Sequence, residues 1–379
     1  MINKIYKRNL MSVYARWLYY TKALRTNKKI VVIESDDWGS IRTSNREAYD
    51  TLLQDGYDMS KSPYTFDALE SNEDLTELYS VLNSVSDSQG NPACFTANMI
   101  MANPDFIAIE KNNFSKYVYE TVDKTLDKYE GRDKVIGLWK EGMATKTFHP
   151  QLHAREHVRY WEWMKALKEN DDEARKTFQL GMCGLPRVVS KNGQSYFQPP
   201  YIDDKILNEH NVDLNQLISG GAELFKNEFG FYSKTTIAPN CGWTSSCEKI
   251  WKKNHVKFIQ GGYLQKHHYS KKTKYIAHYL GQKSKTEGLI YLVRNCTFEP
   301  STSTNPNYWK GTFKQVENAF NKKTPALISS HRVNFIGSID KNNRKNGLEQ
   351  LHELLNKILK KWPETIFMNS EDFTKLMHK

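Results

Sequence analysis

Cysteine and long apolar runs are both scarce in this sequence. The chain has 379 residues but only 5 cysteines, and no two of them form a CxxC pair. An odd, small number of unpaired cysteines argues against a disulfide framework or a cysteine zinc site and fits a reducing compartment. The first 28 residues are basic and contain only short apolar runs, which excludes a secretory signal and a membrane span. We therefore expect a cytoplasmic protein, either free or peripheral to the inner membrane.

Acidic residues are also outnumbered. The chain has 54 Lys and Arg against 43 Asp and Glu, a formal charge of +11. Such an excess is typical of a lysine-rich surface, and it also suits an anionic partner such as nucleic acid, an anionic membrane surface or an acidic glycan. Aromatic residues make up 12% of the chain. They suit stacking on sugar rings, although a large core uses the same side chains.

Strand-like and helix-like segments alternate along the chain. This alternation predicts an α/β fold with a mainly parallel sheet, open or closed into a barrel. No repeat or linker is evident, so we expect a basic N-terminal segment (1–28) and a single domain (29–379) with an insertion around 172–235. The predicted strands are 29–35, 92–100, 256–262, 288–298, 325–331 and 365–370, and the predicted helices are 72–85, 114–129, 155–170, 245–254, 313–323 and 347–362.

The first predicted strand ends in a pair of carboxylates. In "VVIESDDWG" the apolar run leads into Asp36 and Asp37. Two adjacent aspartates repel each other, and burying either without a partner is costly. In parallel α/β folds the chemistry collects at the carboxyl ends of strands, where His331 in "ALISSH" also falls. The pair therefore predicts a cation nearby.

A histidine segment supplies a way to hold that cation. "FHPQLHAREHV" places His149, His153 and His157 four residues apart, although the whole chain has only 11 histidines. On a helix, residues i and i+4 share a face, so His153 and His157 would reach one ion together. Two imidazoles and one carboxylate form a common catalytic metal site. One of Asp36 and Asp37 would then bind the metal, and the other would act as general base.

These segments, in this order, resemble the motifs of the polysaccharide deacetylase family (NodB-like, carbohydrate esterase family 4), in particular a divergent "polysaccharide (de)acetylase" branch. The similarity covers "IESDDWG", "HAREH", "ACFTANM" and "LISSH", and spans about residues 29–372. It implies a distorted (β/α) barrel of about seven strands. It also implies a divalent metal, with Zn²⁺ as the expected ion and Co²⁺, Ni²⁺ or Fe²⁺ as alternatives.

The resemblance assigns roles to individual residues. It makes Asp36 the base, His331 the general acid, and Asp37, His153 and His157 the metal ligands. The spacing of "HPQLH" leaves His149 as an alternative ligand. Further predicted positions are the oxyanion and substrate residues Asn240, Trp243 and Trp38, the last two as a platform for a sugar ring.

Two family features are missing or indistinct. "IAPNCGW" (237–243) keeps a proline and an aromatic but lacks the arginine that normally orients the base. The candidates to replace it are Arg42, Arg294 and Arg332. The acidic residue that tunes the catalytic histidine is also not distinct, and Glu299 in "NCTFEP" is the candidate.

The resulting hypothesis is a metal-dependent hydrolase that removes N-acetyl groups from an amino sugar of a surface polysaccharide or its precursor. Lipid-linked or nucleotide-linked glycans and an anionic membrane surface are the expected partners, and no nucleic acid is expected. Two alternatives stay open: an O-acetyl esterase or other amide hydrolase of the same fold, and an inactive glycan-binding barrel.

Overall fold

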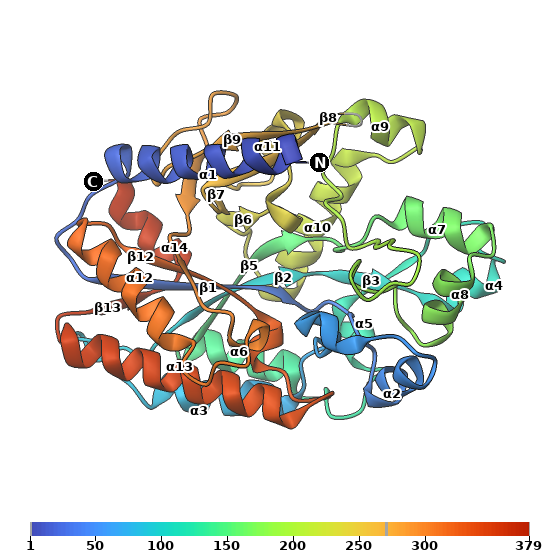
Figure 1. Ribbon diagram of the computed structural model, residues 1–379, viewed down its shortest axis with the longest axis horizontal. Coiled ribbons are helices and arrows are strands. Elements are labelled where there is room, and N and C mark those ends of the chain that lie inside the picture. Colours follow the sequence, from blue (N-terminus) through green and yellow to red (C-terminus); the bar gives the residue numbers. More distant parts are fainter. Residues whose placement is uncertain (1, 270–271, 379) are drawn as a thin grey trace.

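The computed structural model describes residues 2–269 and 272–378, so residues 1, 270–271 and 379 lie outside the described part of the chain. Its centre is a nine-stranded sheet with the strand order β10-β7-β6-β5-β2-β1-β12-β11, and β13 pairs with β1 outside this path. Every strand pairing in this sheet is parallel (Figure 1). The strands are β1 (Ile30–Trp38), β2 (Phe95–Ile100), β5 (Phe148–Ala154), β6 (Thr235–Ile237), β7 (Phe258–Gly261), β10 (Ile290–Val293), β11 (Cys296–Thr297), β12 (Ala326–His331) and β13 (Ile366–Met368).

The two ends of this path are joined by only two residues, and this closes the sheet into a barrel. Arg294 and Asn295 lie between β10 and β11. The Arg294 N–H donates to the Gly261 carbonyl of β7, and the Asn295 N–H donates to the Leu327 carbonyl of β12. With β10 and β11 counted as one position, seven strands surround the axis. The predicted distorted barrel of about seven strands is confirmed.

Helices cover the outside of the barrel. In Figure 1, α3 and α13 lie along one side, and α1 crosses the opposite side beside the β8–β9 hairpin. The helices are α1 (Ile2–Lys22), α2 (Arg46–Gln54), α3 (Asn72–Asn83), α4 (Phe106–Lys111), α5 (Val122–Leu126), α6 (Val135–Ala144), α7 (Tyr160–Lys168), α8 (Asp172–Gln179), α9 (Asp204–Glu209), α10 (Leu214–Phe229), α11 (Ser245–Lys253), α12 (Trp309–Asn321), α13 (Lys341–Lys361) and α14 (Ser370–Lys375). Two hairpins complete the fold: β3 (Ala102–Pro104) with β4 (Tyr119–Thr121), and β8 (Leu264–Tyr269) with β9 (Lys272–Ala277).

The basic N-terminal segment packs against the barrel. Ala15 and Tyr19 of α1 are buried, as is Ala23 directly after it. The Tyr19 hydroxyl accepts a hydrogen bond from Asn295 at 2.9 Å. The helix is therefore tied to Asn295, one of the two residues that close the barrel. Among the described helices, none has both the length and the hydropathy needed to cross a membrane.

Two predicted helices were wrong or too long. Segment 114–129 contains the short strand β4 and the short helix α5, and the helix expected at 155–170 begins only at Tyr160. The histidine segment is not helical either, because β5 runs through Phe148–Ala154. Phe148 and Leu152 pack into the main core. Gln151 and His153, which flank Leu152, contact polar partners instead. This two-residue alternation, typical of a strand, is visible in "FHPQLHA". The region 172–235 contains three helices, α8, α9 and α10.

One glycine allows α13 to approach the loop that follows β12. A Cβ added at Gly347 would lie 1.7 Å from the backbone oxygen of Asn334. Asn334 belongs to the turn Arg332–Phe335, directly after His331. No side chain fits there unless the helix or the loop moves.

We expect Gly347→Ala to lower the free energy of unfolding by roughly 1–3 kcal/mol, because overpacking forces the backbone to shift. Gly311→Ala on the exposed side of α12 is the matched control, since nothing lies within 4 Å of a Cβ built there. That change should stabilise the helix by about 0.5–1 kcal/mol. Urea unfolding of both variants measures the difference, and equal stabilities would contradict the close packing of α13.

Candidate active site

The two aspartates reach one cavity because β1 is irregular at its end. Ser35 pairs with Ala97 and Trp38 pairs with Met99, so β1 has one residue more than β2 between these positions. Asp37 adopts a left-handed backbone with φ 76°, and Gly39 follows with φ 80°. In a regular strand, neighbouring side chains point to opposite faces. The extra residue breaks that alternation, and Asp36 and Asp37 both line the same cavity of about 320 Å³.

Asp37 lies with the two histidines of "HAREH". One Asp37 carboxylate oxygen (Oδ1) is 3.3 Å from Nε2 of His153 and 3.6 Å from Nε2 of His157. All three side chains are buried, and one ligand atom from each lies within 4.8 Å of the others. The other Asp37 oxygen (Oδ2) accepts a hydrogen bond from Arg42 at 3.2 Å.

This donor set fits a divalent cation. The Nδ1 of His153 contacts the Ile237 carbonyl at 2.8 Å, so Nδ1–H donates there and Nε2 keeps its lone pair for a metal, as in many metal sites. Burial, together with the Arg42 guanidinium, lowers the pKa of His157 to about 3, and the imidazole is therefore neutral. Burial alone would raise the pKa of Asp37, but Arg42 and His157 outweigh it and hold this pKa well below its usual range. A carboxylate and two neutral imidazoles are a common ligand set for Zn²⁺.

Asp36 has different partners. Its two oxygens accept a bidentate pair of hydrogen bonds from Arg294, each 2.7 Å long, and Asn98 donates a third at 2.7 Å. Arg294 also donates to Glu34 at 2.6 Å. Burial alone would raise the pKa of Asp36, but the Arg294 guanidinium outweighs it and lowers this pKa, so Asp36 is ionised at neutral pH.

Arg294 is the one of the three arginine candidates that contacts Asp36. Arg42 pairs with Asp37 instead. Arg332 is fully buried against Asp67, Glu70 and the Ser40 carbonyl, where it supports the loop after β1.

His331 lies across the cavity from the metal-ligand cluster. Its Nε2 is 3.9 Å from Asp36, and its Nδ1 contacts Glu299 at 2.6 Å. The other oxygen of Glu299 accepts a hydrogen bond from Asn334 at 2.7 Å. Burial alone would lower the pKa of His331, but Glu299 and Asp36 outweigh it and raise this pKa to about 10. The imidazole therefore carries a proton at neutral pH, and Glu299 occupies the position expected of the acidic residue that tunes the histidine.

The structure does not support every predicted site residue. Trp38 is 0% exposed and Trp243 is 2% exposed, so neither ring can stack on a sugar, and the predicted platform is wrong. Trp38 donates to Ser35, and Trp243 donates to Glu248. His149 lies 3.1 Å from Glu371, away from the metal-ligand cluster, so it is not an alternative ligand there.

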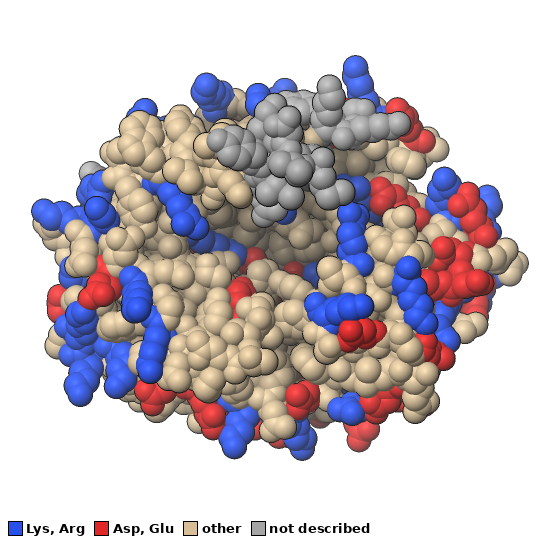
Figure 2. Space-filling view, in the orientation of Figure 1, with Lys and Arg blue, Asp and Glu red and all other residues tan. Residues whose placement is uncertain are grey.

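Other residues of the cavity were not foreseen. Tyr64 and Phe197 provide its aromatic lining, and the Tyr64 ring meets His331 edge-on at 5.7 Å. Asn240 lines the cavity as predicted, with a left-handed backbone (φ 55°) and a side chain that donates to the Phe197 carbonyl. No sequence signal separates Tyr64 or Phe197 from ordinary aromatic core residues. In Figure 2 a hollow near the centre of the surface has carboxylates at its base and basic side chains around its rim.

Comparisons with known proteins gave no match to a family model and none to a curated protein. Among solved structures, the chain resembles a protein of Mycobacterium smegmatis described as a polysaccharide deacetylase, with 9% identity, a TM-score of 0.44, and coverage of 94% of this chain and 93% of that one. A protein of Pseudomonas aeruginosa PAO1 described in the same way has 8% identity, a TM-score of 0.45, and coverage of 93% and 92%.

The 4-alpha-glucanotransferase of Thermococcus litoralis also resembles the chain, with 6% identity and a TM-score of 0.44. The likeness covers 92% of this chain but only 40% of the glucanotransferase. Solved structures that resemble the chain thus include proteins described as polysaccharide deacetylases and also a 4-alpha-glucanotransferase. All three TM-scores are below 0.5, so these likenesses carry no information on the chemistry of the site.

We expect Asp37→Ala, His153→Ala and His157→Ala each to weaken zinc binding more than about 100-fold, because loss of a ligand should cost more than loss of a partner behind it. His149→Ala is the matched control and should bind zinc like the unaltered protein. Metal analysis after dialysis against graded zinc measures the affinity. If His149→Ala lost zinc and His157→Ala retained it, the two metal-binding histidines would have been assigned incorrectly.

Proposed function

We propose that this protein is a metal-dependent hydrolase that removes N-acetyl groups from an amino sugar of a surface polysaccharide or of its precursor. The observation that carries the proposal is the division of labour between two adjacent aspartates. Asp37 points to a buried histidine pair, whereas Asp36 is held by Arg294 and faces His331. A structural pair of carboxylates would not need a protonated imidazole that lines the cavity beside one of them.

A divalent cation held by Asp37, His153 and His157 would polarise the acetamide carbonyl and make water more acidic. The chain's own residues supply the proton transfers. Asp36 is ionised and fixed in orientation, so it accepts a proton from the attacking water. His331 donates its Nε2 proton to the departing nitrogen as the carbon–nitrogen bond breaks, which yields acetate and a free amine.

The protonation state of His331 favours an amide over an ester as substrate. An alcohol leaves an ester readily, but an amide nitrogen leaves poorly unless it is protonated. With a pKa of about 10, His331 keeps its proton across the physiological range. Glu299 maintains that proton through the Nδ1 contact, so the acid is built for a poor leaving group.

Arg294 also weakens the case for an inactive barrel. The absence of an arginine from "IAPNCGW" favours an inactive barrel, but the Arg294 guanidinium contacts the proposed base instead. The cytoplasmic location, the absence of nucleic-acid binding and the choice of Zn²⁺ over Co²⁺, Ni²⁺ or Fe²⁺ stay predictions.

The direct test is acetate release by the zinc-loaded protein from N-acetylated chitooligosaccharides, with O-acetylated xylooligosaccharides as the comparison. We expect release from the N-acetyl substrate and little from the O-acetyl one. Preference for the O-acetyl substrate would favour the esterase alternative, and release from neither, despite bound zinc, would contradict a sugar deacetylase.

We expect Asp36→Asn to lower kcat by about 10²–10⁴-fold, the usual contribution of a general base. Its zinc content should stay at the level of the unaltered protein, because Asp36 is not in the metal-ligand cluster. Acetate-release kinetics and metal analysis on the same preparation measure both effects. A normal kcat would show that Asp36 is not the base.

We expect Glu299→Gln to move the alkaline limb of the kcat profile to lower pH. The neutral amide removes the anion that raises the pKa of His331, while burial continues to lower it, so the acid loses its proton at a lower pH. The acidic limb, set by other groups, should move less. An unchanged alkaline limb would mean that His331 does not set it.

A further inference from the structure

A second cavity adjoins the active site and lacks the carboxylates of the catalytic cavity. Its volume is about 530 Å³, and it shares Cys241, Arg294 and Ser329 with the catalytic cavity. None of its described lining residues is acidic, whereas the catalytic cavity contains Asp36 and Asp37. A substrate held at His331 would therefore extend past Ser329 into a region with basic and neutral polar walls.

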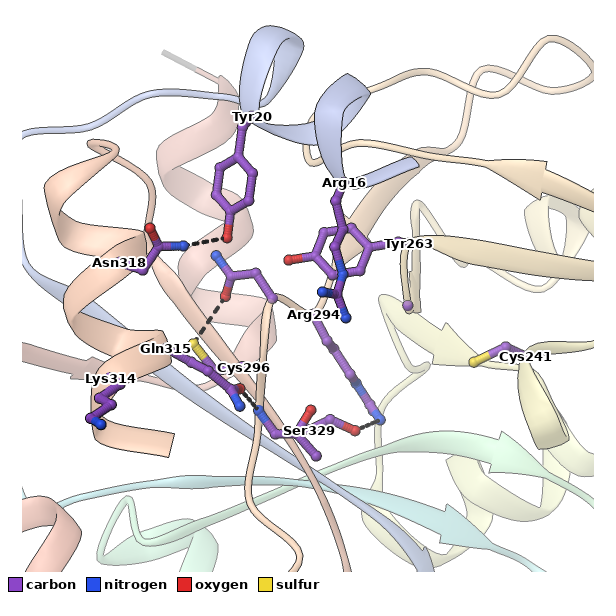
Figure 3. Close-up of a pocket in the computed structure, with 13 residues that line it drawn as sticks. Arg16, Tyr20, Cys241, Tyr263, Arg294, Cys296, Lys314, Gln315, Asn318 and Ser329 are labelled. Atoms are coloured by element: carbon purple, nitrogen blue, oxygen red, sulfur yellow. Dashed lines mark hydrogen bonds between the residues drawn. The ribbon is translucent and has the colours of Figure 1, made fainter. Parts of the chain in front are cut away.

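The walls of this cavity come from elements far apart in the sequence. Figure 3 shows Arg16 and Tyr20 reaching in from α1, with Tyr263 beside Arg16 and with Lys314 and Asn318 on α12. Asn318 donates to the Tyr20 hydroxyl at 2.8 Å and so joins the two helices. α1 therefore forms part of the cavity wall.

Two cations of this cavity are not neutralised. Arg294 is paired with Glu34 and Asp36, but Arg16 and Lys314 form no ion pair or hydrogen bond with any described residue. The Arg16 guanidinium lies 6.0 Å from the centre of the Tyr263 ring, and this is its one described interaction. Two cations without counter-charges on either side of a hollow attract an anion.

Neutral donors complete the lining. The side-chain oxygen of Gln315 (Oε1) accepts a hydrogen bond from the Thr297 N–H at 2.7 Å. The side-chain nitrogen of Gln315 (Nε2) is therefore left as a donor. Guanidinium, ammonium and amide donors together suit the several oxygens of a phosphate or a carboxylate.

We propose that this cavity binds an oxyanion of the substrate, a phosphate or a carboxylate on or next to the sugar that is deacetylated. The proposal rests on the proposed function, because it takes the adjoining cavity to hold the acetamide. It narrows the substrate class to anionic glycans or sugar phosphates.

Calorimetric binding of deacetylated products tests this inference, because products bind without being consumed. The charged probes carry an anionic group and are glucosamine 1-phosphate, glucosamine 6-phosphate and a glucuronyl-glucosamine disaccharide. Glucosamine, which has the same amine but no anionic group, is the reference probe. We expect at least one charged probe to bind more tightly than glucosamine, and the identity of that probe distinguishes phosphate from carboxylate.

In the Arg16→Ala/Lys314→Ala double variant, binding of the preferred charged probe should weaken about 10-fold or more, with glucosamine binding unchanged. Lys22→Ala on α1 and Lys310→Ala on α12 are matched controls, since both side chains are exposed and neither lines the cavity. Arg16→Lys keeps the charge and should retain most of the affinity. These surface changes should leave the melting temperature unchanged.

Equal affinity for glucosamine and for every probe with an anionic group would overturn the proposal. A preference for the anionic group that survives in the double variant would also overturn it. Acetate release from N-acetylglucosamine and from the N-acetylated form of the preferred charged probe is measured in parallel with the same proteins. Loss of the charge preference in the double variant, in a protein that never releases acetate, would support the anion site and reject the hydrolase. Acetate release without any preference for charged probes would support the hydrolase and reject the anion site.

Discussion

The bidentate contact between Arg294 and Asp36 is the interaction on which the rest of the site depends. Three carboxylates, from Glu34, Asp36 and Asp37, are buried within four residues at the end of one strand. Arg294 binds the first two, which lie on one face of β1, while Asp37 turns toward Arg42 and the histidines. This separation of partners gives two neighbouring aspartates different chemistry. Without Arg294, burial would raise the pKa of Asp36 and weaken the ionisation on which its proposed role as base depends.

The barrel makes this contact possible by the way it closes. Arg294 follows β10 at the point where the two ends of the sheet meet, so its side chain enters the barrel at the carboxyl ends of the strands. There Gln260 of β7 and Asn98 of β2 bond to each other and to the Arg294–Asp36 pair. The same closure anchors α1, through Asn295 and Tyr19. The catalytic geometry and the wall of the neighbouring basic cavity thus depend on one short segment.

Local motifs predicted those residues of the site that belong to short sequence patterns. An acidic strand end and a four-residue spacing predicted a metal site made of one of the two aspartates with His153 and His157, and the family resemblance selected Asp37. The alternation of segments predicted a parallel α/β sheet, and the resemblance predicted the barrel. The reason given for the histidine pair was wrong, because His153 lies in the strand β5 and His157 lies in the loop that follows it. Nothing local distinguished Arg294 from Arg42 and Arg332, since the choice depends on which strands close the barrel. The burial of Trp38 and Trp243 could not be predicted from the local sequence either, because it also depends on how the strands and helices pack together.

The central claim is that a divalent cation binds Asp37, His153 and His157 while Asp36 stays with Arg294. Crystals of the protein soaked in zinc, with the ion located by its anomalous scattering, test it most directly. The account predicts one buried ion about 2.0–2.2 Å from one oxygen of Asp37 and from Nε2 of both histidines, with the Arg294 contact to Asp36 intact. An ion bound by Asp36 in place of Asp37, or no ion in this cavity, would contradict the account.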